Sequence, residues 1–521
     1  MTAPTPQGSR ASHKARRKHL HNRRALLRAA STALSVAGFS SLHRTAAQTP
    51  TPNTALGDLQ QRLAGQLLLP QDTAFSVANT PANRSYQDVT PIAIARCADE
   101  ADVITCVQWC AENGVPPVAR GGGHSSAGYS TTTGLLIDLR SLDTVTVDHA
   151  AGTLTAEGGA TMASLQMALN DSPFFLPGAT CPTVGIGGLT LGGGIGSDAR
   201  WAGLTCDHLR QTRLISANGE LLDVAADQHS DLFWALRGGA GGSYGVNTSF
   251  IFDLVETPAT PVSNFTVRWR GADAAGLVLQ AFQALMQHAP PEFGATVTVI
   301  PRDPAESGKR RSIDVLLSGH FIGQASDLQD LLTPLLGVKT PPVEHTIAAL
   351  PFRESQRRLS ESVTHALAFT GISRYANAPL PDDVTAQLVS GLINCPYRTD
   401  VAHGTLTLFG WVGGILTQTS RSATAYVHRD MTLLWRTGAV WSPEQPPRVG
   451  NELTAWTQEI TSLIAPHTPN ESYQNFPNTG IPEWQQQFYA ENLQRLIEVK
   501  TAYDPDDIFR NPQSIPVSPG A

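Results

Sequence analysis

The spacing of apolar residues over residues 80–257 predicts a mixture of helices and short strands. Residues 98–114 carry apolar side chains at 103, 104, 107 and 110, a helical period that ends at Gly114. Two apolar runs within 213–225 are joined by Asn218-Gly219, which predicts a hairpin. Further helices are expected at 161–170 and 229–239, and further strands at 135–139, 144–148, 153–159 and 243–256.

Beyond a junction at 257–262, strand and helix patterns form separate runs. The expected strands are 264–270, 296–300, 313–321, 404–412 and 425–435, and the expected helices are 275–289, 327–337 and 382–393. A helix is also expected from the end of a linker at 48–57 to about Leu69, and one long helix over 481–509. Because these runs are not regular βαβ units, they predict an α+β fold.

Composition narrows the functional classes. The 521 residues suggest roughly two to four domains. With 41% hydrophobic and 16% charged residues, the chain is typical of a globular protein. A net charge of −7, without a basic stripe after the N-terminal region, argues against nucleic-acid binding. The six cysteines lack metal-ligand spacing, so Cys106 and Cys110 are interpreted as buried thiols and no metal is expected.

The N-terminal region has the pattern of an export signal. Residues 10–28 contain many basic residues and no acidic one, and the apolar run 25–42 follows. Residues 22–28, with Arg23 and Arg24, resemble a twin-arginine signal, and Thr45-Ala46-Ala47 offers small residues for cleavage. We therefore assign residues 1–47 to a signal that is read by the export machinery; the alternative is a basic, disordered N-terminus. No later stretch reaches the ~20 apolar residues of a membrane span.

Two glycine-rich stretches carry the candidate chemistry. Arg120-Gly121-Gly122-Gly123-His124-Ser125 follows an apolar run, and residues 176–196 contain Cys181 among further glycines. Glycines let backbone N–H groups crowd around an anion such as a phosphate. The second stretch lacks the strand and the acidic partner of a Rossmann motif, and a glycine run alone is equally typical of a flexible loop. A nucleophilic side chain in each stretch favours a flavin that is bound covalently.

Four segments together resemble the berberine bridge enzyme-like family, FAD-linked oxidases of the vanillyl-alcohol oxidase superfamily. They are RGGGHSSAGYS (120–130), PGATCPTVGIGGLTLGGGIGSDARWAGLTCD (177–207), DLFWALRGGAGGSYGV (231–246) and VKTAYDPDDIFRNPQSIP (499–516). The resemblance implies a PCMH-type FAD-binding domain of two α+β subdomains over residues 80–257. It also implies a substrate domain with an antiparallel sheet backed by helices over 258–470, and a C-terminal segment, 471–516, that returns to the FAD-binding domain.

The resemblance also implies which residues hold the cofactor. His124 would bond the 8α-methyl group of the flavin and Cys181 its C6 atom, although a turn histidine and a buried thiol are the structural alternatives. Val184 would lie where dioxygen approaches the flavin. The other residues expected to bind FAD are Arg120, Gly121, Gly122, Gly123, Ser125, Gly187, Gly188, Gly192, Gly193, Gly196, Gly245, Val246 and Asn475.

The catalytic base is less well defined by the pattern. Tyr473 and Asn475 match the Tyr-x-Asn-aromatic stretch of the family, but Phe476 stands where several members carry a base-acting tyrosine. A phenyl ring cannot accept a proton, so Tyr473, Tyr426, His428 or an unplaced acid remain as candidates. Tyr426 and His428 could equally be ordinary strand side chains. A tyrosine with its ordinary pKa of ~10 would need that pKa lowered to act as a base.

These observations predict a secreted or periplasmic oxidase with bicovalent FAD. Its small-molecule substrate would be a sugar, a secondary alcohol or another metabolite, and dioxygen would be the acceptor and yield H2O2. One alternative is a dehydrogenase that passes electrons to a quinone or another carrier. The other is a flavin-loaded binding protein without turnover, which the phenylalanine at 476 favours.

Overall fold

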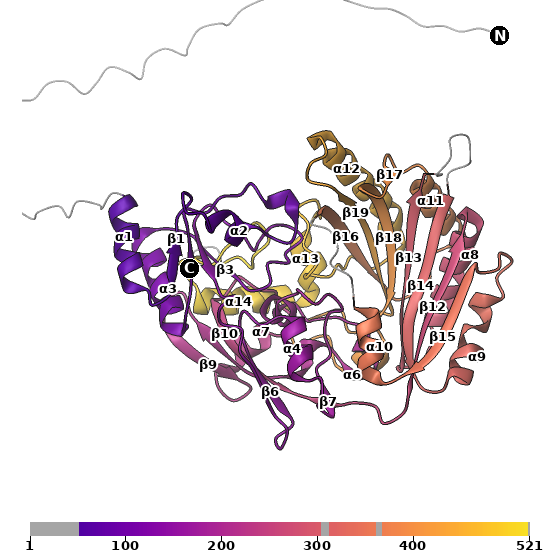
Figure 1. Cartoon of the computed structure of the whole chain (residues 1–521), viewed down its shortest axis with the longest axis horizontal. Coiled ribbons are helices and arrows are strands. Elements are labelled where there is room, and N and C mark those ends of the chain that lie inside the picture. Colours follow the sequence, from indigo (N-terminus) through magenta and orange to yellow (C-terminus); the bar gives the residue numbers. More distant parts are fainter. Residues whose placement is uncertain (1–51, 304–311, 361–366, 519–521) are drawn as a thin grey trace, which may run out of the picture. The chain divides into compact units, whose positions relative to one another are not determined.

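The computed structural model describes residues 52–303, 312–360 and 367–518, and these form an α+β fold built on three main sheets (Figure 1). The predicted export signal lies outside the described residues. Shorter elements connect the sheets: α2 (Phe75–Asn79), η1 (Arg84–Tyr86), β7 (Phe174–Phe175), α5 (Ile186–Leu191), α6 (Ala199–Ala202), η2 (Thr205–His208), β11 (Val255–Glu256), β17 (Arg398–Thr399), η3 (Gly414–Gln418) and η4 (Ala465–His467).

A four-stranded sheet with the order β1-β2-β4-β3 opens the fold. Its elements are α1 (Pro52–Arg62), β1 (Gln66–Leu68), β2 (Ala93–Arg96), α3 (Glu100–Asn113), β3 (Pro117–Arg120) and β4 (Leu135–Asp138). Helix α3 confirms the helical period of 98–114. It begins where the Asp99 side chain accepts a hydrogen bond from Asp102 N–H and ends at Gly114, whose φ of 64° is left-handed. Its buried face packs on the sheet, and Cys106 and Cys110 on that face are buried thiols, as predicted.

A five-stranded antiparallel sheet with the order β5-β6-β10-β8-β9 follows. Its elements are β5 (Val145–Asp148), β6 (Thr153–Glu157), α4 (Met162–Ala168), β8 (Leu209–Ile215), β9 (Leu221–Ala225), α7 (Ser230–Ala235) and β10 (Val246–Asp253). The predicted hairpin is present, because β8 pairs with β9 across a turn in which Gly219 has a φ of 78°.

The largest sheet has eight antiparallel strands, and helices cover one of its faces (Figure 1). Its strands are β12 (Val262–Arg270), β13 (Phe293–Arg302), β14 (Ser312–Ile322), β15 (Glu344–Leu350), β16 (Ala368–Ala376), β18 (Ala402–Gly410) and β19 (Leu433–Trp441), together with β17. The helices of this region are α8 (Ala272–Met286), α9 (Ala325–Leu336), α10 (Phe352–Leu359), α11 (Asp382–Ile393) and α12 (Pro447–Ile464).

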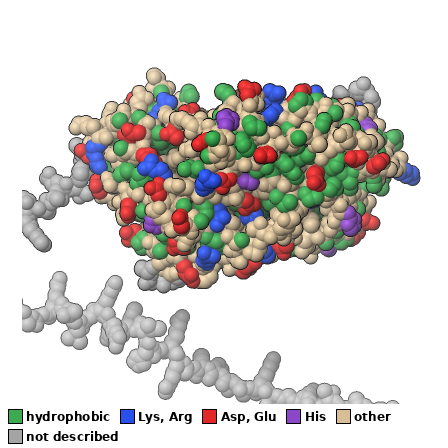
Figure 2. Space-filling view, turned by 90° about the horizontal axis from the view of Figure 1, so that it is seen from below, with side chains coloured by type: hydrophobic (Ala, Val, Ile, Leu, Met, Phe, Trp, Pro, Cys, Tyr) green, Lys and Arg blue, Asp and Glu red, His purple; other side chains and the backbone are tan. Residues whose placement is uncertain are grey.

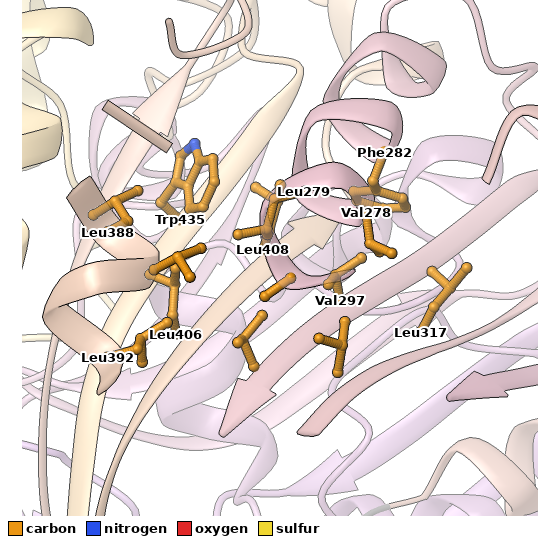
Figure 3. Packing of buried hydrophobic residues seen from close by; sticks show 14 of the residues in the cluster. Val278, Leu279, Phe282, Val297, Leu317, Leu388, Leu392, Leu406, Leu408 and Trp435 are labelled. Atoms are coloured by element: carbon orange, nitrogen blue, oxygen red, sulfur yellow. The ribbon is translucent and has the colours of Figure 1, made fainter. Parts of the chain in front are cut away.

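The main hydrophobic core lies between this sheet and its helices (Figure 3). Side chains from α8 and α11 meet alternate residues of the strands; they are Val278, Leu279, Phe282, Leu388, Leu392, Val297, Leu317, Leu406, Leu408 and Trp435. Burial of each such side chain contributes roughly 1.5–3 kcal/mol. The opposite face of the sheet supplies Tyr375, Leu434 and Phe409 to a second cluster, which also contains Ile195 of the glycine-rich stretch.

The C-terminal segment returns to the first part of the chain, as Figure 1 shows. It consists of α13 (Trp484–Tyr489), η5 (Ala490–Asn492) and α14 (Leu493–Tyr503). The fully buried Lys500 Nζ donates to the Ser243 carbonyl at 2.8 Å and lies 2.5 Å from Asp504 Oδ2, which fixes α14 to the loop before β10. The single helix expected over 481–509 is wrong, because Ala490 has a φ of 41° and interrupts it.

Two other element predictions are wrong. Residues 425–432 do not form a strand. Ala425 N–H donates to Trp234 O and Tyr426 N–H to Arg237 O, so the backbone of these two residues is bonded at the end of α7, and the strand begins at Leu433. The first helix ends at Arg62 rather than near Leu69, because Gln66–Leu68 pairs with β2 instead. Strands β15 and β16 and helices α10 and α12 were not predicted from the sequence.

The surface seen in Figure 2 carries positive and negative side chains interspersed with one another. Exposed pairs such as Arg268–Glu344, at 3.1 Å, contribute little to stability because water screens them. Among the described residues, no helix has the length and apolar character needed to cross a bilayer. The same residues bring together no group of three metal-ligating side chains that could hold an ion.

Candidate functional site

The first glycine stretch begins at the end of β3, where the buried side chain of Arg120 binds neighbouring backbone segments. This arginine is 1% exposed. Its guanidinium donates to the carbonyls of Ser130, Ala78 and Asn79 at 2.6–2.9 Å. The side chain of Arg120 therefore supports the loop and is not directed into open space, whereas Gly121, Gly122, His124 and Ser125 are all partly exposed.

The two glycine stretches touch each other. A Cβ atom on Gly122 would lie 2.2 Å from the Gly185 nitrogen, and one on Gly185 would lie 2.4 Å from the Gly122 nitrogen. A Cβ on Gly121 would lie 2.8 Å from the Gly158 carbonyl oxygen. Only glycine permits backbones to approach this closely. The glycines thus bring the segment of His124 against the segment of Cys181.

His124 and Cys181 meet at the hydroxyl of Thr183. His124 Nε2 lies 2.7 Å from Thr183 Oγ1, and Cys181 Sγ lies 3.5 Å from the same oxygen. Thr183 is exposed, while His124 and Cys181 are partly buried. Burial lowers the pKa of His124, so the imidazole is neutral and nucleophilic at neutral pH. Thr183 was not among the predicted site residues; its hydroxyl two residues after Cys181 was the available signal.

The remaining glycines of the second stretch serve two different purposes. A Cβ on Gly188 would meet open space, so this glycine borders the exposed side of the loop. Gly187 has only ordinary contacts, the nearest being Phe250 at 3.5 Å. By contrast, a Cβ on Gly192 would lie 2.0 Å from Asn475 Oδ1, and one on Gly193 would lie 2.6 Å from the Tyr426 ring.

Two further glycines pack against backbone atoms. A Cβ on Gly196 would lie 1.8 Å from the Gly178 carbonyl oxygen. Gly245 has a φ of 155°, and a Cβ on it would lie 2.4 Å from the Ile215 carbonyl oxygen. Val246, the next residue, is 1% exposed. These glycines and Gly192 and Gly193 are required by close packing within the protein.

Tyr473 is anchored to the glycine-rich stretch. Its hydroxyl oxygen accepts hydrogen bonds from Gly194 N–H at 3.1 Å, Ile195 N–H at 3.2 Å and the Asn475 side-chain amide at 3.1 Å. The residue is 3% exposed, and burial raises its pKa to about 12 even though these three donors favour the phenolate. Asn475 also donates to the Leu189 carbonyl at 2.9 Å. It thereby ties the Tyr-x-Asn stretch to α5.

Tyr426 and His428 lie in the same buried region as Tyr473. The hydroxyl groups of Tyr426 and Tyr375 are 2.8 Å apart, and the Tyr375 ring stacks on His428 with centroids 4.2 Å apart. His428 Nδ1 lies 2.5 Å from Glu471 Oε2, while its Nε2 is buried without a hydrogen-bond partner. The structure thus brings all three predicted catalytic side chains together, but each is buried.

Phe476 faces both this cluster and a cation. Its ring centroid lies 5.0 Å from that of Tyr473 in an edge-on arrangement. The guanidinium carbon of Arg436, on β19, lies 5.3 Å from the Phe476 centroid. This distance is typical of a cation–π contact. A guanidinium is a proton donor at neutral pH, so neither residue can act as the base.

A buried polar cluster that the sequence did not predict joins the glycine-rich stretch to the large sheet. Asp198 Oδ1 lies 3.2 Å from His320 Nε2 on β14, and His320 Nδ1 lies 3.3 Å from Ser355 Oγ on α10. Asp198 Oδ2 accepts hydrogen bonds from Ser197 and Gln356, both at 3.2 Å. These residues are far apart in sequence, so no local pattern pointed to them.

Beside this cluster is a small cleft with a volume of about 30 Å³. Its lining includes Thr180, which precedes Cys181, together with Asp198, Arg353 and Gln356. Burial lowers the pKa of Arg353, and the Asp198 carboxylate opposes that shift. The cleft therefore has a cation and an anion in its wall.

Comparisons with known proteins agree with this geometry. Residues 91–225 match the FAD binding domain model, and residues 472–516 match the model described as berberine and berberine like. The chain is 30% identical over 461 residues to an uncharacterised FAD-linked oxidoreductase, YgaK, of Bacillus subtilis, covering 87% of this chain and 97% of the relative. Berberine bridge enzyme-like 7 of Arabidopsis thaliana is 28% identical over 443 residues, covering 78% and 81%.

Solved structures show the same fold. BBE-like 1 of Physcomitrella patens superposes with a TM-score of 0.78 at 26% identity, covering 89% of this chain and 99% of the other. Berberine bridge enzyme from Eschscholzia californica gives a TM-score of 0.78 at 25% identity, with the same coverage. The chain therefore belongs to the berberine bridge enzyme-like family and is an FAD-linked oxidoreductase.

Proposed function

We propose that the protein is an oxidase that holds FAD through two covalent bonds, to His124 and Cys181. It would remove a hydride from an alcohol, a sugar or a related metabolite and pass the electrons to dioxygen, which yields H2O2. The observation that carries the proposal is the meeting of His124 and Cys181 at one hydroxyl, on two glycine loops in backbone contact.

The residues at these loops fit a flavin dinucleotide. Gly188 borders open space, and the N–H groups of residues 121–125 lie on a partly exposed loop that suits a pyrophosphate. A neutral imidazole and a thiol are the nucleophiles suited to bonding the ring. When bound, FAD supplies the hydride acceptor. The protein's part is to fix the ring and to leave one face for substrate.

We assign the proton-accepting role to Tyr473. Three N–H donors converge on its oxygen and offset part of the rise in pKa that burial causes, which supports this choice over Tyr426, whose hydroxyl pairs with Tyr375. His428 would not accept the proton itself but would act indirectly, through its stacking on Tyr375. Phe476 would contribute an apolar wall beside the reacting atoms.

The name of a relative supports the choice of substrate class. A relative in Arabidopsis thaliana, 27% identical over 431 residues, is named a monolignol oxidoreductase, and an alcohol is the substrate class we propose here.

We place the FAD-binding domain at 80–257, the substrate domain at 258–470 and the returning segment at 471–516. The N-terminal pattern supports export to the periplasm or the medium through the twin-arginine route.

The test of the proposal is an anaerobic screen in which the flavin absorbance is followed after mixing with sugars, alcohols and amines. Bleaching by one class identifies an enzyme and its substrate, and readmitting air should restore the colour with release of peroxide. Bleaching without peroxide release would indicate a dehydrogenase that uses another acceptor. The phenylalanine at 476 favours the second candidate, a flavin-loaded binding protein, and absence of bleaching with every class would support it.

A further inference from the structure

Thr183 lies between the two candidate tether residues, and the proposed function gives it no role. Its Oγ1 lies within hydrogen-bonding reach of both candidate tether residues, at 2.7 Å from His124 Nε2 and 3.5 Å from Cys181 Sγ. The side chain is exposed, on the open side of the loop. A hydroxyl has one proton to donate and can accept from a second group, so it can couple two neighbours.

The turn that carries Thr183 is held rigidly by its backbone. Val184 N–H donates to the Cys181 carbonyl at 3.3 Å, and the first turn of α4 caps the loop, with Met162 N–H donating to Val184 O at 2.9 Å and Ala163 N–H to Pro182 O at 2.8 Å. A Cβ on Gly122 would lie 2.7 Å from the Thr183 carbonyl oxygen. Thr183 is therefore fixed against the loop of His124, and only its side chain can rotate.

One direction of the two hydrogen bonds satisfies all three groups. The neutral His124 donates from Nε2–H to Thr183 Oγ1, and the threonine hydroxyl donates to Cys181 Sγ. This arrangement leaves the lone pair of His124 on Nδ1, free to form a bond. It also stabilises negative charge on the sulfur, and the thiolate is the reactive form of cysteine. The burial that keeps His124 neutral acts in the same direction.

We propose that Thr183 is the positioning residue for covalent attachment of the flavin, and that its hydroxyl prepares both His124 and Cys181 to bond the ring. This inference rests on the proposed bicovalent function. Each tether replaces a C–H bond of the flavin, of the 8α-methyl group for His124 and at C6 for Cys181, and an N–H or S–H bond of the protein by a C–N or C–S bond. Each therefore releases two protons and two electrons, and dioxygen takes up the electrons.

The test compares Thr183→Val, which keeps the shape but removes the hydroxyl, with Thr183→Ser, which keeps the hydroxyl. Each is placed in the His124→Ala and the Cys181→Ala background, so that one bond is followed at a time. Full-length protein from flavin-depleted cells is mixed with FAD in air and sampled into acid. Intact mass then gives the fraction of chains that have gained one FAD.

We expect Thr183→Val to slow the formation of both covalent bonds by about tenfold or more, which is the effect of losing one hydrogen bond to a reacting group. Thr183→Ser should attach FAD at nearly the rate of the parent. Equal rates for the Val variant and its parent in both backgrounds would overturn the role of Thr183 and leave the proposed function intact. Release of free FAD from denatured wild type would instead overturn the bicovalent function itself.

A second measurement does not depend on whether the Val variant folds. NMR of the flavin peptide isolated from the wild-type protein identifies which imidazole nitrogen carries the ring. Attachment through Nδ1 is expected, since Thr183 holds Nε2. Attachment through Nε2 would overturn the proposal, because that nitrogen could not then bond the threonine as described.

Discussion

Asp198 Oδ1 and His320 Nε2 are 3.2 Å apart, although the aspartate follows the glycine-rich stretch and the histidine lies near the end of β14 in the large sheet. Their side chains are 3% and 1% exposed. Removing one partner of a polar pair this deeply buried is costly, because the group that remains loses its counterpart without regaining water. The contact therefore couples the proposed cofactor-binding and substrate regions.

Replacing Asp198 by Ala should lower the free energy of unfolding by about 3–5 kcal/mol, the usual loss when one partner of a buried pair is removed. The reason is that Gln356 and Ser197 lose the acceptor of their hydrogen bonds, and His320 loses the carboxylate beside it. Chemical denaturation followed by circular dichroism measures the change. Asp227→Ala, at an exposed position, is the control. A loss below about 1 kcal/mol would show that the cluster contributes little to stability.

His124→Ala and Cys181→Ala should each still hold FAD covalently, because the other bond remains. Acid-precipitated protein should stay yellow in both single variants and become colourless only in the double variant. Intact mass should exceed the polypeptide by one FAD in the first two cases. If one single variant releases its flavin, the residue replaced there is the sole link.

Tyr473→Phe should lower the rate of anaerobic flavin reduction by roughly 10²–10⁴-fold, the range for loss of a general base. Since burial raises the pKa of Tyr473 to about 12, the wild-type rate should rise with pH across the neutral and mildly alkaline range. The Phe variant should lose this rise. Stopped-flow absorbance measures both properties.

The Phe variant also leaves the N–H groups of Gly194 and Ile195 without their acceptor, so its melting temperature must be compared with that of wild type. A stable variant whose reduction rate stays within a few-fold of wild type would transfer the role to Tyr426, to His428 or to an acid. His428→Gln and Tyr426→Phe are then the next variants to measure.

Val184→Leu should slow reoxidation of the reduced flavin by dioxygen without slowing its reduction by substrate. The larger side chain would fill the space beside Cys181 through which dioxygen is proposed to approach. Stopped-flow mixing of the reduced protein with aerated buffer measures the first rate, and anaerobic mixing with substrate measures the second. Equal reoxidation rates in both proteins would place the oxygen path elsewhere.

Replacing both Arg23 and Arg24 by Lys should hold the precursor inside the cell. The substitution keeps the charge of the region but removes the pair that a twin-arginine receptor reads. Cell fractionation followed by immunoblotting measures the distribution. A variant that changes two other basic residues, Arg16 and Arg17, to Lys is the control. Normal export of the Arg23/Arg24 variant would indicate another route.

The sequence alone determined those elements and residues whose signals are local. Helix α3 follows from a helical period between an Asp cap and Gly114, and the β8–β9 hairpin follows from Asn218-Gly219. His124 and Cys181 were recognisable because each stands in a glycine-rich motif. Backbone propensity and motif chemistry depend on only a few neighbouring residues, so these features can be predicted without knowledge of the fold.

Only the tertiary structure decided features that depend on distant partners. Residues 425–435 have a strand-like pattern, but Ala425 and Tyr426 bond to backbone at the end of α7 and the strand begins only at Leu433, because the partners that decide this lie far away in the sequence. The break at Ala490 and the contact of Asp198 with His320 likewise arise from packing across the chain. The meeting of His124 and Cys181 at Thr183 depends on the close approach of two glycine loops, which sequence spacing cannot specify.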